Sequence, residues 1–227
     1  MRYPIPSLSS GRVTLKMREY HDLLHVVHEE IDGIGPWLWI AEDWEGYRWP
    51  KEDWQNTHRD VWLKHTKNRS VCVQAGGFQG MYPRLLSEHF DMVYTFEPDP
   101  LHYFCLVNNC QKDNIIKAQG ALGAGPGLID TVSLCSHNRG MGKVRDGSKI
   151  PTFSVDMLGL QDCGFIQLDI EGYERQALRG AERTIRKFHP IISCERKHDN
   201  DDVLDIMAEL GYKAIDNVGD DTVFAFT

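Results

Sequence analysis

Residues 71–83 read Val-Cys-Val-Gln-Ala-Gly-Gly-Phe-Gln-Gly-Met-Tyr-Pro, and this stretch decides the fold of the chain. Its apolar start predicts a strand, and Gly76, Gly77 and Gly80 predict a turn. A helical pattern follows over residues 80–90. Because glycine has no Cβ, we expect the turn to bring backbone N–H groups and a helix N-terminus close to a ligand.

The next apolar run ends in an acid. Residues 92–97 predict a second strand, and Glu97 closes it. An acid about 20 residues beyond a glycine-rich turn, at the end of a second strand, is where a nucleotide ribose is held. The two stretches together predict a nucleotide pocket, and by themselves they leave NAD, a flavin and S-adenosylmethionine open.

Length and charge narrow the class of protein. The chain has 227 residues, which is enough for one large α/β domain with a real core. Its formal net charge is −8 and it has no basic block, which argues against nucleic acid as the main partner. No apolar run approaches the ~20 residues of a membrane span, and we expect no secretory signal in the first ten residues.

The six cysteines do not form any Cys-x-x-Cys pair. Most of them lie within apolar runs, where a free cysteine behaves as a small hydrophobic residue. We therefore expect reduced, buried thiols in a cytoplasmic protein, in preference to a disulfide framework or a zinc site.

The N-terminal segment predicts a helix over residues 14–31 from the spacing of its apolar residues. His21, His25 and His28 share one side of that helix, at spacings that can hold a metal ion. No acidic or cysteine partner is fixed nearby, so we expect a solvated face and no metal.

All six tryptophans fall within residues 37–62, interspersed with carboxylates. Tryptophan combines a large apolar face with one N–H donor, which suits a half-exposed surface. We expect residues 1–69 to form an N-terminal helix and a Trp-rich cap packed on the sheet. The alternative interpretations are an acceptor pocket and a homodimer surface.

From residue 70 onwards, apolar strands alternate with helices, which predicts an α/β domain with a mostly parallel sheet covered on both faces. The last two strands are joined by a turn-rich stretch and should form an antiparallel hairpin at the sheet edge. Residues 120–153 break the alternation and predict a β-hairpin insertion whose polar tip overhangs the pocket. The expected strands are 71–74, 92–97, 115–119, 164–170, 190–195, 212–216 and 222–226, and the expected helices are 80–90, 100–111, 174–188 and 200–210.

Polar residues follow the carboxyl ends of these strands, where open parallel sheets bind their ligands. Each end carries an acid or an amide, and none carries a phosphate-binding lysine. A pyrophosphate cofactor prefers cationic or neutral surroundings, whereas the cationic S-adenosylmethionine suits acidic ones. The strand ends are Gln74 with Gly76–Gly80, Glu97, Gln119–Leu122, Asp169-Ile170-Glu171-Gly172 and Glu195.

Several motifs from residue 70 to the end carry a family resemblance: Phe96-Glu97-Pro98-Asp99-Pro100, Asn138-x-Gly140, Asp169-Ile170-Glu171-Gly172 with Leu178-Arg179-Gly180-Ala181, and His189-Pro190 running to Glu195. In this order and spacing they resemble the FkbM-type methyltransferases, S-adenosylmethionine-dependent O-methyltransferases with a Rossmann-like seven-stranded sheet whose last strand is antiparallel. The chain departs from the family pattern at three positions. It has Gln74 where an acid is usual, Phe78 where Asn is usual, and Gln167 where Lys is frequent.

The resemblance implies roles for individual residues. Glu97 would bind the ribose hydroxyls, and Gln74 would accept a hydrogen bond through its amide oxygen. The three glycines of the turn would pass under the methionine moiety, and Ala121 and Leu122 would lie by the adenine.

On the acceptor side, Asp169 and Glu171 would face the methyl group and the acceptor. A base must take the acceptor's proton. The candidate bases are Asp169, Glu171, Glu195, His137 and His198, and the candidate acceptor contacts are Asn138, Arg139 and His198.

The sequence thus predicts an O-methyltransferase acting on a hydroxyl of a sugar, a glycan or a small metabolite. Gln74 and Phe78 favour an alternative, a non-catalytic binding or scaffold module that keeps the fold. A nicotinamide-dependent oxidoreductase shares the glycine-rich turn, but the Asp-Ile-Glu-Gly motif does not support it.

Overall fold

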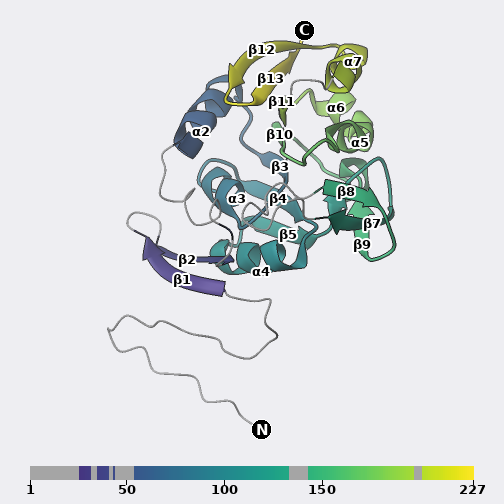
Figure 1. The fold of residues 1–227 in the computed structure, drawn as a ribbon. Helices are drawn as coiled ribbons and strands as arrows, with labels where there is room; N and C mark the ends of the chain where they lie inside the picture. Colours follow the sequence, from purple (N-terminus) through teal and green to yellow (C-terminus); the bar gives the residue numbers. More distant parts are fainter. Residues whose placement is uncertain (1–25, 32–34, 41–42, 44–53, 133–142, 197–200) are drawn as a thin grey trace.

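The computed structural model describes residues 26–31, 35–40, 43, 54–132, 143–196 and 201–227. Its centre is a seven-stranded sheet in the order β12-β13-β11-β10-β3-β4-β5 (Figure 1). In that order the strands span Tyr212–Val218, Asp221–Phe226, Ile191–Glu195, Phe165–Leu168, Val71–Ala75, Met92–Glu97 and Ile115–Gln119.

Five neighbouring strands, from β11 to β5, are parallel, and β13 is antiparallel to both of its neighbours. The expected α/β fold, with a mostly parallel sheet and an antiparallel hairpin at one edge, is therefore confirmed. The predicted strands 92–97 and 115–119 match β4 and β5 residue for residue. The parallel strands all end at one edge of the sheet, and the polar residues that follow them are gathered there.

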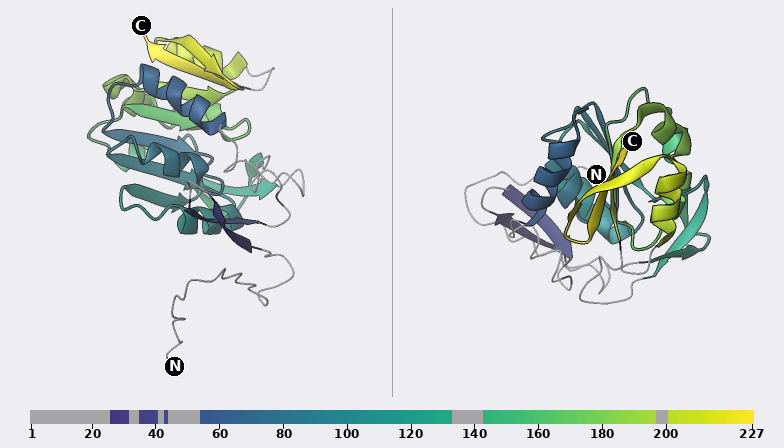
Figure 2. Two further views of the ribbon diagram at one scale, coloured as in Figure 1. Left: turned by 90° about the vertical axis from the view of Figure 1, so that its left-hand side faces the viewer. Right: turned by 90° about the horizontal axis from the view of Figure 1, so that it is seen from above.

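Helices cover both faces of the sheet, as Figure 2 shows. Successive side chains of a strand point to opposite faces of the sheet. Cys72 and Phe165 therefore pack with Trp62 on one face, while Val73 and Ile166 lie in the larger core on the other. The first face carries α2 (Trp54–His65), α3 (Met81–Leu86) and α4 (Pro100–Asn109), and the second carries the 3₁₀ helix η3 (Val155–Leu158), α5 (Glu174–Arg179), α6 (Glu182–Phe188) and α7 (Asp201–Glu209).

Two predicted helices were too long. The helix expected over 80–90 ends at Leu86, where the backbone changes to bonds between residues three apart, such as that from the His89 N–H to the Leu86 carbonyl. The helix expected over 174–188 is two helices with a break at Gly180. A Cβ there would lie 1.9 Å from the carbonyl oxygen of Gly123, so the chain approaches another backbone too closely for any other residue.

The helix predicted over 14–31 is wrong for residues 26–31. These residues form β1 (Val26–Ile31), which pairs antiparallel with β2 (Gly35–Ile40). The tertiary pairing outcompetes the helical spacing, and β-branched Val26 and Val27 favour a strand. His28 therefore lies on a strand, while His21 and His25 lie outside the described residues.

In the Trp-rich segment, Trp62 packs on Phe165 of the sheet, whereas the β1–β2 hairpin packs on α4. Asn109 fixes it, because its side chain accepts a 2.7 Å hydrogen bond from the Leu38 N–H and donates a 2.8 Å bond to the Leu38 carbonyl. Trp37 and Trp39 of β2 are buried. The irregular pattern of residues 37–62 thus contains a strand and a helix, which the sequence reading missed.

Helix α2 belongs to the same core as the sheet. Trp62 is fully buried, and its ring packs edge-on against Tyr82 at 5.0 Å between centroids. Its indole N–H donates a 2.9 Å hydrogen bond to Ser193 Oγ in β11. The domain boundary between residues 69 and 70 stays a prediction.

The insertion after β5 is a second, four-stranded sheet in the order β6-β9-β7-β8. β7 (Gly127–Val132) and β8 (Lys143–Asp146) pair antiparallel, so the hairpin is confirmed, while its tip at 133–142 lies outside the described residues. β6 (Ala121–Leu122) pairs with β9 (Ile150–Phe153) and follows β5 directly. The insertion therefore leaves the main sheet beside the end of β4.

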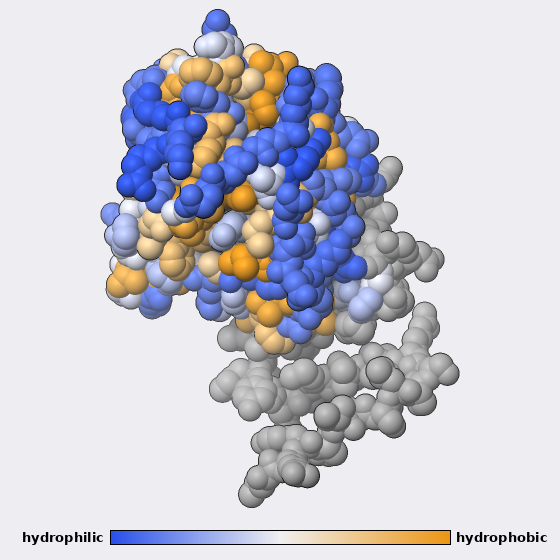
Figure 3. All heavy atoms as spheres, turned by 180° about the vertical axis from the view of Figure 1, so that it is seen from behind, coloured by the Kyte–Doolittle hydropathy of each residue, from blue (hydrophilic) through white to orange (hydrophobic). Residues whose placement is uncertain are grey.

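No helix among the described residues is long and apolar enough to cross a membrane. The exposed large hydrophobic side chains there lie on separate elements, for example Phe104 of α4, Leu128 of β7 and Phe226 of β13. Figure 3 shows apolar side chains in several groups among polar ones on the back face. The homodimer stays a prediction.

Replacing Trp62 tests whether α2 is part of the core. Trp62→Ala removes a fully buried aromatic side chain, and we expect the free energy of unfolding in urea to fall by about 3–5 kcal/mol. Trp62→Phe keeps an aromatic ring but loses the N–H bonded to Ser193, so a loss of about 1–3 kcal/mol is expected. Phe104→Ala, on an exposed side chain, is the control and should cost less than about 1 kcal/mol. Equal losses for Trp62→Ala and Phe104→Ala would contradict this packing.

Candidate functional site

The site is built on the turn that joins β3 to α3. Gly76 and Gly80 have φ of 82° and 100°, in the left-handed region that glycine enters without strain. Gly76 is also forced by space, because a Cβ there would lie 1.8 Å from the backbone oxygen of Asp169. The turn is thus pressed against the end of β10, and both segments reach the same edge of the sheet.

The N–H groups of this turn are used inside the protein. Gly76 and Gly77 both donate to the Phe96 carbonyl, Gly80 donates to the Gly77 carbonyl, and Phe78 donates to the Glu97 carboxylate. The expectation that these N–H groups face a ligand is therefore wrong for these four residues. An anion cradle of the kind that binds pyrophosphate needs free N–H groups, so the turn does not suit a dinucleotide.

Glu97 lies at the end of β4, beside the turn, and is 5% exposed. Its two oxygens accept hydrogen bonds from the N–H groups of Phe78 (2.7 Å) and Asp99 (2.8 Å). Burial raises the pKa of Glu97, while the charge of His102 and the two N–H bonds lower it. The carboxylate is fixed in one orientation, with part of its accepting capacity left.

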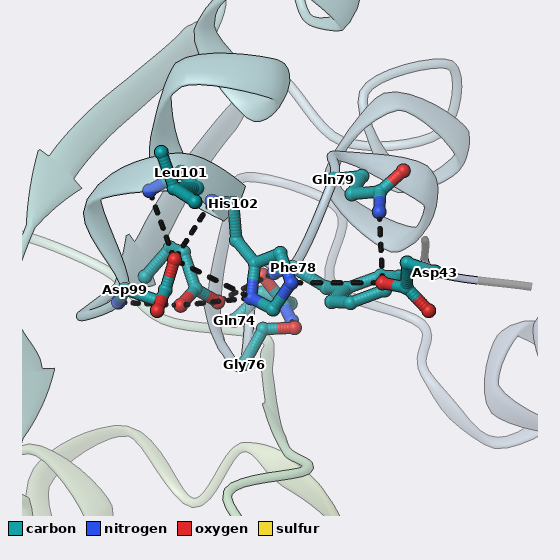
Figure 4. Close-up of polar contacts among 9 residues, drawn as sticks. Asp43, Gln74, Gly76, Phe78, Gln79, Asp99, Leu101 and His102 are labelled. Atoms are coloured by element: carbon teal, nitrogen blue, oxygen red, sulfur yellow. Dashed lines mark hydrogen bonds and ion pairs between the residues drawn. The ribbon is translucent and has the colours of Figure 1, made fainter. Parts of the chain in front are cut away.

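Two residues missed by the sequence analysis, His102 and Asp43, belong to this site, and Figure 4 shows His102 between Asp99 and Asp43. His102 is buried in the first turn of α4, with Nδ1 3.9 Å from an oxygen of Glu97 and 3.9 Å from an oxygen of Asp99. Its Nε2 lies 3.6 Å from Asp43 Oδ2, an ion-pair distance too long for a hydrogen bond. Asp43 is fully buried and also accepts a 3.1 Å bond from Gln79.

The acids around His102 change the pKa of its imidazole. Burial by itself lowers the pKa of His102, but Asp43, Glu97 and Asp99 raise it, and the net result is a pKa above the ordinary value. A charged His102 would offset part of the negative charge buried around Glu97. It also ties the segment after β2 to the predicted ribose site.

Phe78 has a left-handed φ of 46°, which is strained for a large side chain. Its ring packs against His102 at 4.5 Å between centroids, and its N–H holds Glu97. The family's usual Asn tolerates this conformation better than Phe does. The departure at residue 78 therefore adds an aromatic contact to the His102 network at the expense of backbone strain.

A row of buried polar residues crosses four strands below this edge. Each is paired in register with the next, and each is at most 1% exposed. Thr95 donates to Gln74 Oε1 at 2.5 Å, and Gln74 Nε2 donates to the Gly76 carbonyl at 2.9 Å. Gln74 thus ties the turn to β4, and its contact with a cofactor stays a prediction. The row is Thr95, Gln74, Gln167 and Ser193.

One step further along the strands lies a group of carboxylates. Asp169, Glu171 and Glu195 each offer one oxygen, and these oxygens lie within 4.8 Å of one another. Two of the three follow β10, and Glu195 ends β11, so the structure brings three predicted catalytic residues together. Glu171 has a left-handed φ of 57° in the turn after β10.

The negative charges in and around this group raise the pKa of neighbouring acids. Burial and then the charge of Asp169 raise the pKa of Glu195 to about 8, and the same two causes raise the pKa of Asp221 to about 8. Burial raises the pKa of Tyr82 well above its ordinary value, and the charge of Asp169 adds to this. Asp221 and Tyr82 thus lie within electrostatic range of Asp169 and Glu195, and the sequence analysis named neither as a site residue.

Of the remaining predicted site residues, two lie in β6 and four lie outside the described residues. Ala121 and Leu122 are buried in β6, and the preceding Gly120 donates its N–H to the Glu97 carbonyl, which puts this segment beside Glu97. Leu122 packs into the main core. His137, Asn138, Arg139 and His198 lie outside the described residues.

A repeated pattern could have located the polar row. In four strands a polar residue stands two positions before a residue that ends the strand or directly follows it. Asp43 gave no such signal, because its contact with His102 depends on how the β1–β2 hairpin packs on α4. The four pairs are Thr95 and Glu97, Gln74 and Gly76, Gln167 and Asp169, and Ser193 and Glu195.

The fold and the site define a class of protein, the Rossmann-like methyltransferases. A family model described as the methyltransferase FkbM domain matches residues 84–214, which is more than half of the chain. The chain therefore belongs to the FkbM methyltransferase family, whose methyl donor is S-adenosylmethionine.

Solved structures resemble the fold at low sequence identity. Methyltransferase FkbM from Methylobacillus flagellatus has a TM-score of 0.51 and 20% identity, and the match covers 74% of this chain but 46% of that one. The chain thus spans about half the length of that relative. N-methyltransferase NodS from Bradyrhizobium japonicum, in complex with S-adenosyl-L-homocysteine, has a TM-score of 0.47 and 10% identity, with 81% and 91% of the two chains covered. No curated protein matches the chain.

The residues present fit this cofactor. Glu97 has accepting capacity left for two hydroxyl groups after its two N–H bonds. The turn offers no free N–H among the four residues named above, and the opposite end of the edge is rich in carboxylates. Such surroundings suit a cationic cofactor with a ribose, and they do not suit a pyrophosphate.

Two glycine variants test the close approach of the turn to β10. Gly76→Ala and Gly172→Ala each place a Cβ at positive φ, but only the first meets another backbone, since nothing lies within 4 Å at Gly172. We expect Gly172→Ala to lower the free energy of unfolding by about 1–2 kcal/mol. Gly76→Ala should cost more than about 4 kcal/mol or prevent folding. Similar urea midpoints for the two variants would show that the contact is not rigid.

The His102 network predicts a pH dependence of stability. Because the folded-state pKa of His102 is raised, its contribution is full below the ordinary histidine pKa and is lost as pH rises through the raised value. The difference in unfolding free energy between wild type and His102→Gln should therefore be larger at about pH 6 than at about pH 9.

His89→Gln is the matched control. Burial lowers the pKa of His89, so the corresponding difference should not shrink as pH rises. Parallel pH profiles for the two variants, measured by urea unfolding, would contradict the proposed charge on His102.

Proposed function

We propose that the protein is an O-methyltransferase that moves a methyl group from S-adenosylmethionine to a hydroxyl of a sugar, a glycan or a small metabolite. The observation that carries this proposal is the pairing, at one sheet edge, of a fixed buried Glu97 with the carboxylates that follow β10 and β11. The first suits the ribose of the cofactor, and the second suits an acceptor that must lose a proton.

When bound, S-adenosylmethionine supplies a methyl group on a positively charged sulfur, which is already activated for transfer. The protein's part is to place the acceptor oxygen in line and to accept its proton. As the methyl group is transferred, the acceptor hydroxyl would give its proton to a carboxylate of the protein. Asp169, Glu171 and Glu195 are the candidates for this base, since their oxygens converge.

The carboxylates also favour a cationic donor electrostatically. Burial and the repulsion of neighbouring acids raise the pKa of Glu195 and of Asp221 to about 8, because the negative form of each costs free energy there. A sulfonium group nearby would lower that cost. The five described cysteines are buried as free thiols, which supports a reducing compartment such as the cytoplasm.

The alternative, a binding module without catalysis, has one observation in its favour. Gln74 stands where the family usually has an acid and is fully buried, and its amide is bonded to Thr95 and to the Gly76 carbonyl. It therefore supplies no charge to the ammonium group of a cofactor. The oxidoreductase interpretation loses support, because the turn uses four of its N–H groups internally.

Calorimetric titration separates these functions. We expect S-adenosylmethionine and S-adenosylhomocysteine to bind with Kd on the order of micromolar, and NAD not to bind. Glu97→Gln should weaken both by about 10-fold or more, because a charged acceptor of hydroxyl groups is lost. Glu88→Gln, on an exposed glutamate, should leave both affinities unchanged.

Binding of neither sulfur compound would remove the proposal, and an unchanged affinity in Glu97→Gln would show that Glu97 does not bind the ribose. Methyl transfer is then measured with tritiated donor and a panel of hydroxyl compounds. Cofactor binding without transfer to any fraction of the panel or of a host extract would favour the binding module.

A further inference from the structure

The carboxylates after β10 and β11 have the geometry of a cation site. One oxygen each from Asp169, Glu171 and Glu195 lies within 4.8 Å of the other two, and all three side chains are half-buried. A cation bound at about 2.0–2.6 Å from each oxygen requires separations in this range. Acidic clusters also occur without ions, so the geometry alone does not make a site.

A second observation comes from the side chain below the cluster. Gln167 is fully buried, and neither its amide oxygen nor its amide nitrogen has a hydrogen-bond partner in the described structure. Gln167 lies on β10, two residues before Asp169, which follows the strand, and its register partner Ser193 precedes Glu195 by two residues on β11. Because side chains two apart on a strand share a face, and register partners share it too, Gln167 lies on the same face as Glu195, one step beneath it.

The described side chains next to Gln167 do not form hydrogen bonds with its amide. Gln74 is bonded to Thr95 and to the Gly76 carbonyl, and the Ser193 hydroxyl accepts from Trp62 and donates to Asp221 at 2.7 Å. A buried amide left without partners costs about 1–3 kcal/mol or more. Such a group is explained when a ligand or an ordered water completes it.

Among the described residues, a second buried oxygen without a hydrogen-bond partner belongs to Glu174, in the helix that follows the cluster. Glu174 is 1% exposed; its Oε1 accepts 3.2 Å bonds from the N–H groups of Ile170 and Gly172, and its Oε2 has no partner among the described residues. Glu174 therefore holds the very turn that carries Asp169 and Glu171. Magnesium and manganese ions keep several water ligands, and those waters donate to acceptors around the first shell.

We propose that Asp169, Glu171 and Glu195 bind one divalent cation of the hard, oxygen-preferring class, such as Mg²⁺ or Mn²⁺, with Gln167 and Glu174 accepting hydrogen bonds from its water ligands. Three carboxylate oxygens and no described cysteine or histidine in the set favour this class over zinc. The remaining positions of the cation would be open to water and to an oxygen of the acceptor. That last role rests on the proposed methyl transfer, whereas the binding of the cation does not.

Manganese binding tests the site directly, without any acceptor. Electron paramagnetic resonance of free Mn²⁺ titrated with the full chain should show one bound ion per chain, displaced by Mg²⁺. Glu171→Gln and Glu195→Gln should each weaken Mn²⁺ by about 10-fold or more, because each removes a charged ligand. Asp220→Asn is the matched control, since Asp220 is exposed, next to Asp221, and outside the set, and its affinity should change less than twofold.

Gln167→Leu separates binding from folding. The apolar side chain removes an unsatisfied buried amide, so the metal-free protein should be as stable as wild type or more stable. Its Mn²⁺ affinity should nevertheless fall by about 10-fold, because the water ligands lose an acceptor. In wild type, Mn²⁺ should raise the melting temperature, and this rise should shrink in Gln167→Leu.

The outcomes distinguish this inference from the proposed function. Wild type that binds S-adenosylhomocysteine but no Mn²⁺ overturns the cation site and leaves the function standing. Equal Mn²⁺ affinity in wild type, Glu171→Gln and Glu195→Gln also overturns it, since the ion would then bind elsewhere. One Mn²⁺ per chain, lost in these variants and kept in Asp220→Asn, supports the site even where no S-adenosylhomocysteine binds.

Discussion

The site depends on one backbone contact, the approach of Gly76 to the carbonyl of Asp169. The Asp169 N–H also donates to the Ala75 carbonyl at 3.1 Å, and the Gly76 N–H donates to the Phe96 carbonyl at 3.2 Å. These contacts join the ends of β10, β3 and β4. The predicted ribose site at Glu97 and the carboxylates after β10 therefore share one rigid edge, and only a residue without Cβ permits it.

The buried polar row below that edge places its side chains by hydrogen bonds. Burying an amide or a hydroxyl costs free energy unless it finds a partner. Thr95 and Gln74 satisfy each other across β4 and β3, and Ser193 is held between Trp62 and Asp221. Gln167 lies between Gln74 and Ser193 and has no hydrogen-bond partner in the described structure, although an apolar residue there would cost less free energy. A ligand at the carboxylates one step further along the strands would explain why an amide lies at this position.

Much of this could be predicted from the sequence, because the parts concerned are local. The strands around the glycine turn, the acid at residue 97 and the motif after residue 168 all lie in short segments with clear patterns. β1 was predicted as the end of a helix, because its pairing with β2 in the β1–β2 hairpin, and not its own apolar spacing, decides its structure. The contact between Asp43 and His102 could not be predicted for the same reason, because it requires the packing of that hairpin on α4.

The two halves of the edge differ in how they are held. Glu97 is fixed by two N–H groups from a tight turn and a helix start, so its position follows from the fold. Glu171 is held differently, in a left-handed conformation that costs about 1–2 kcal/mol for a residue with a side chain. Glu174 offsets this strain by accepting the N–H groups on either side of Glu171. The strained turn brings the Glu171 carboxylate to those of Asp169 and Glu195, against their mutual repulsion, and such an arrangement is retained where the gathered charges have a ligand to bind.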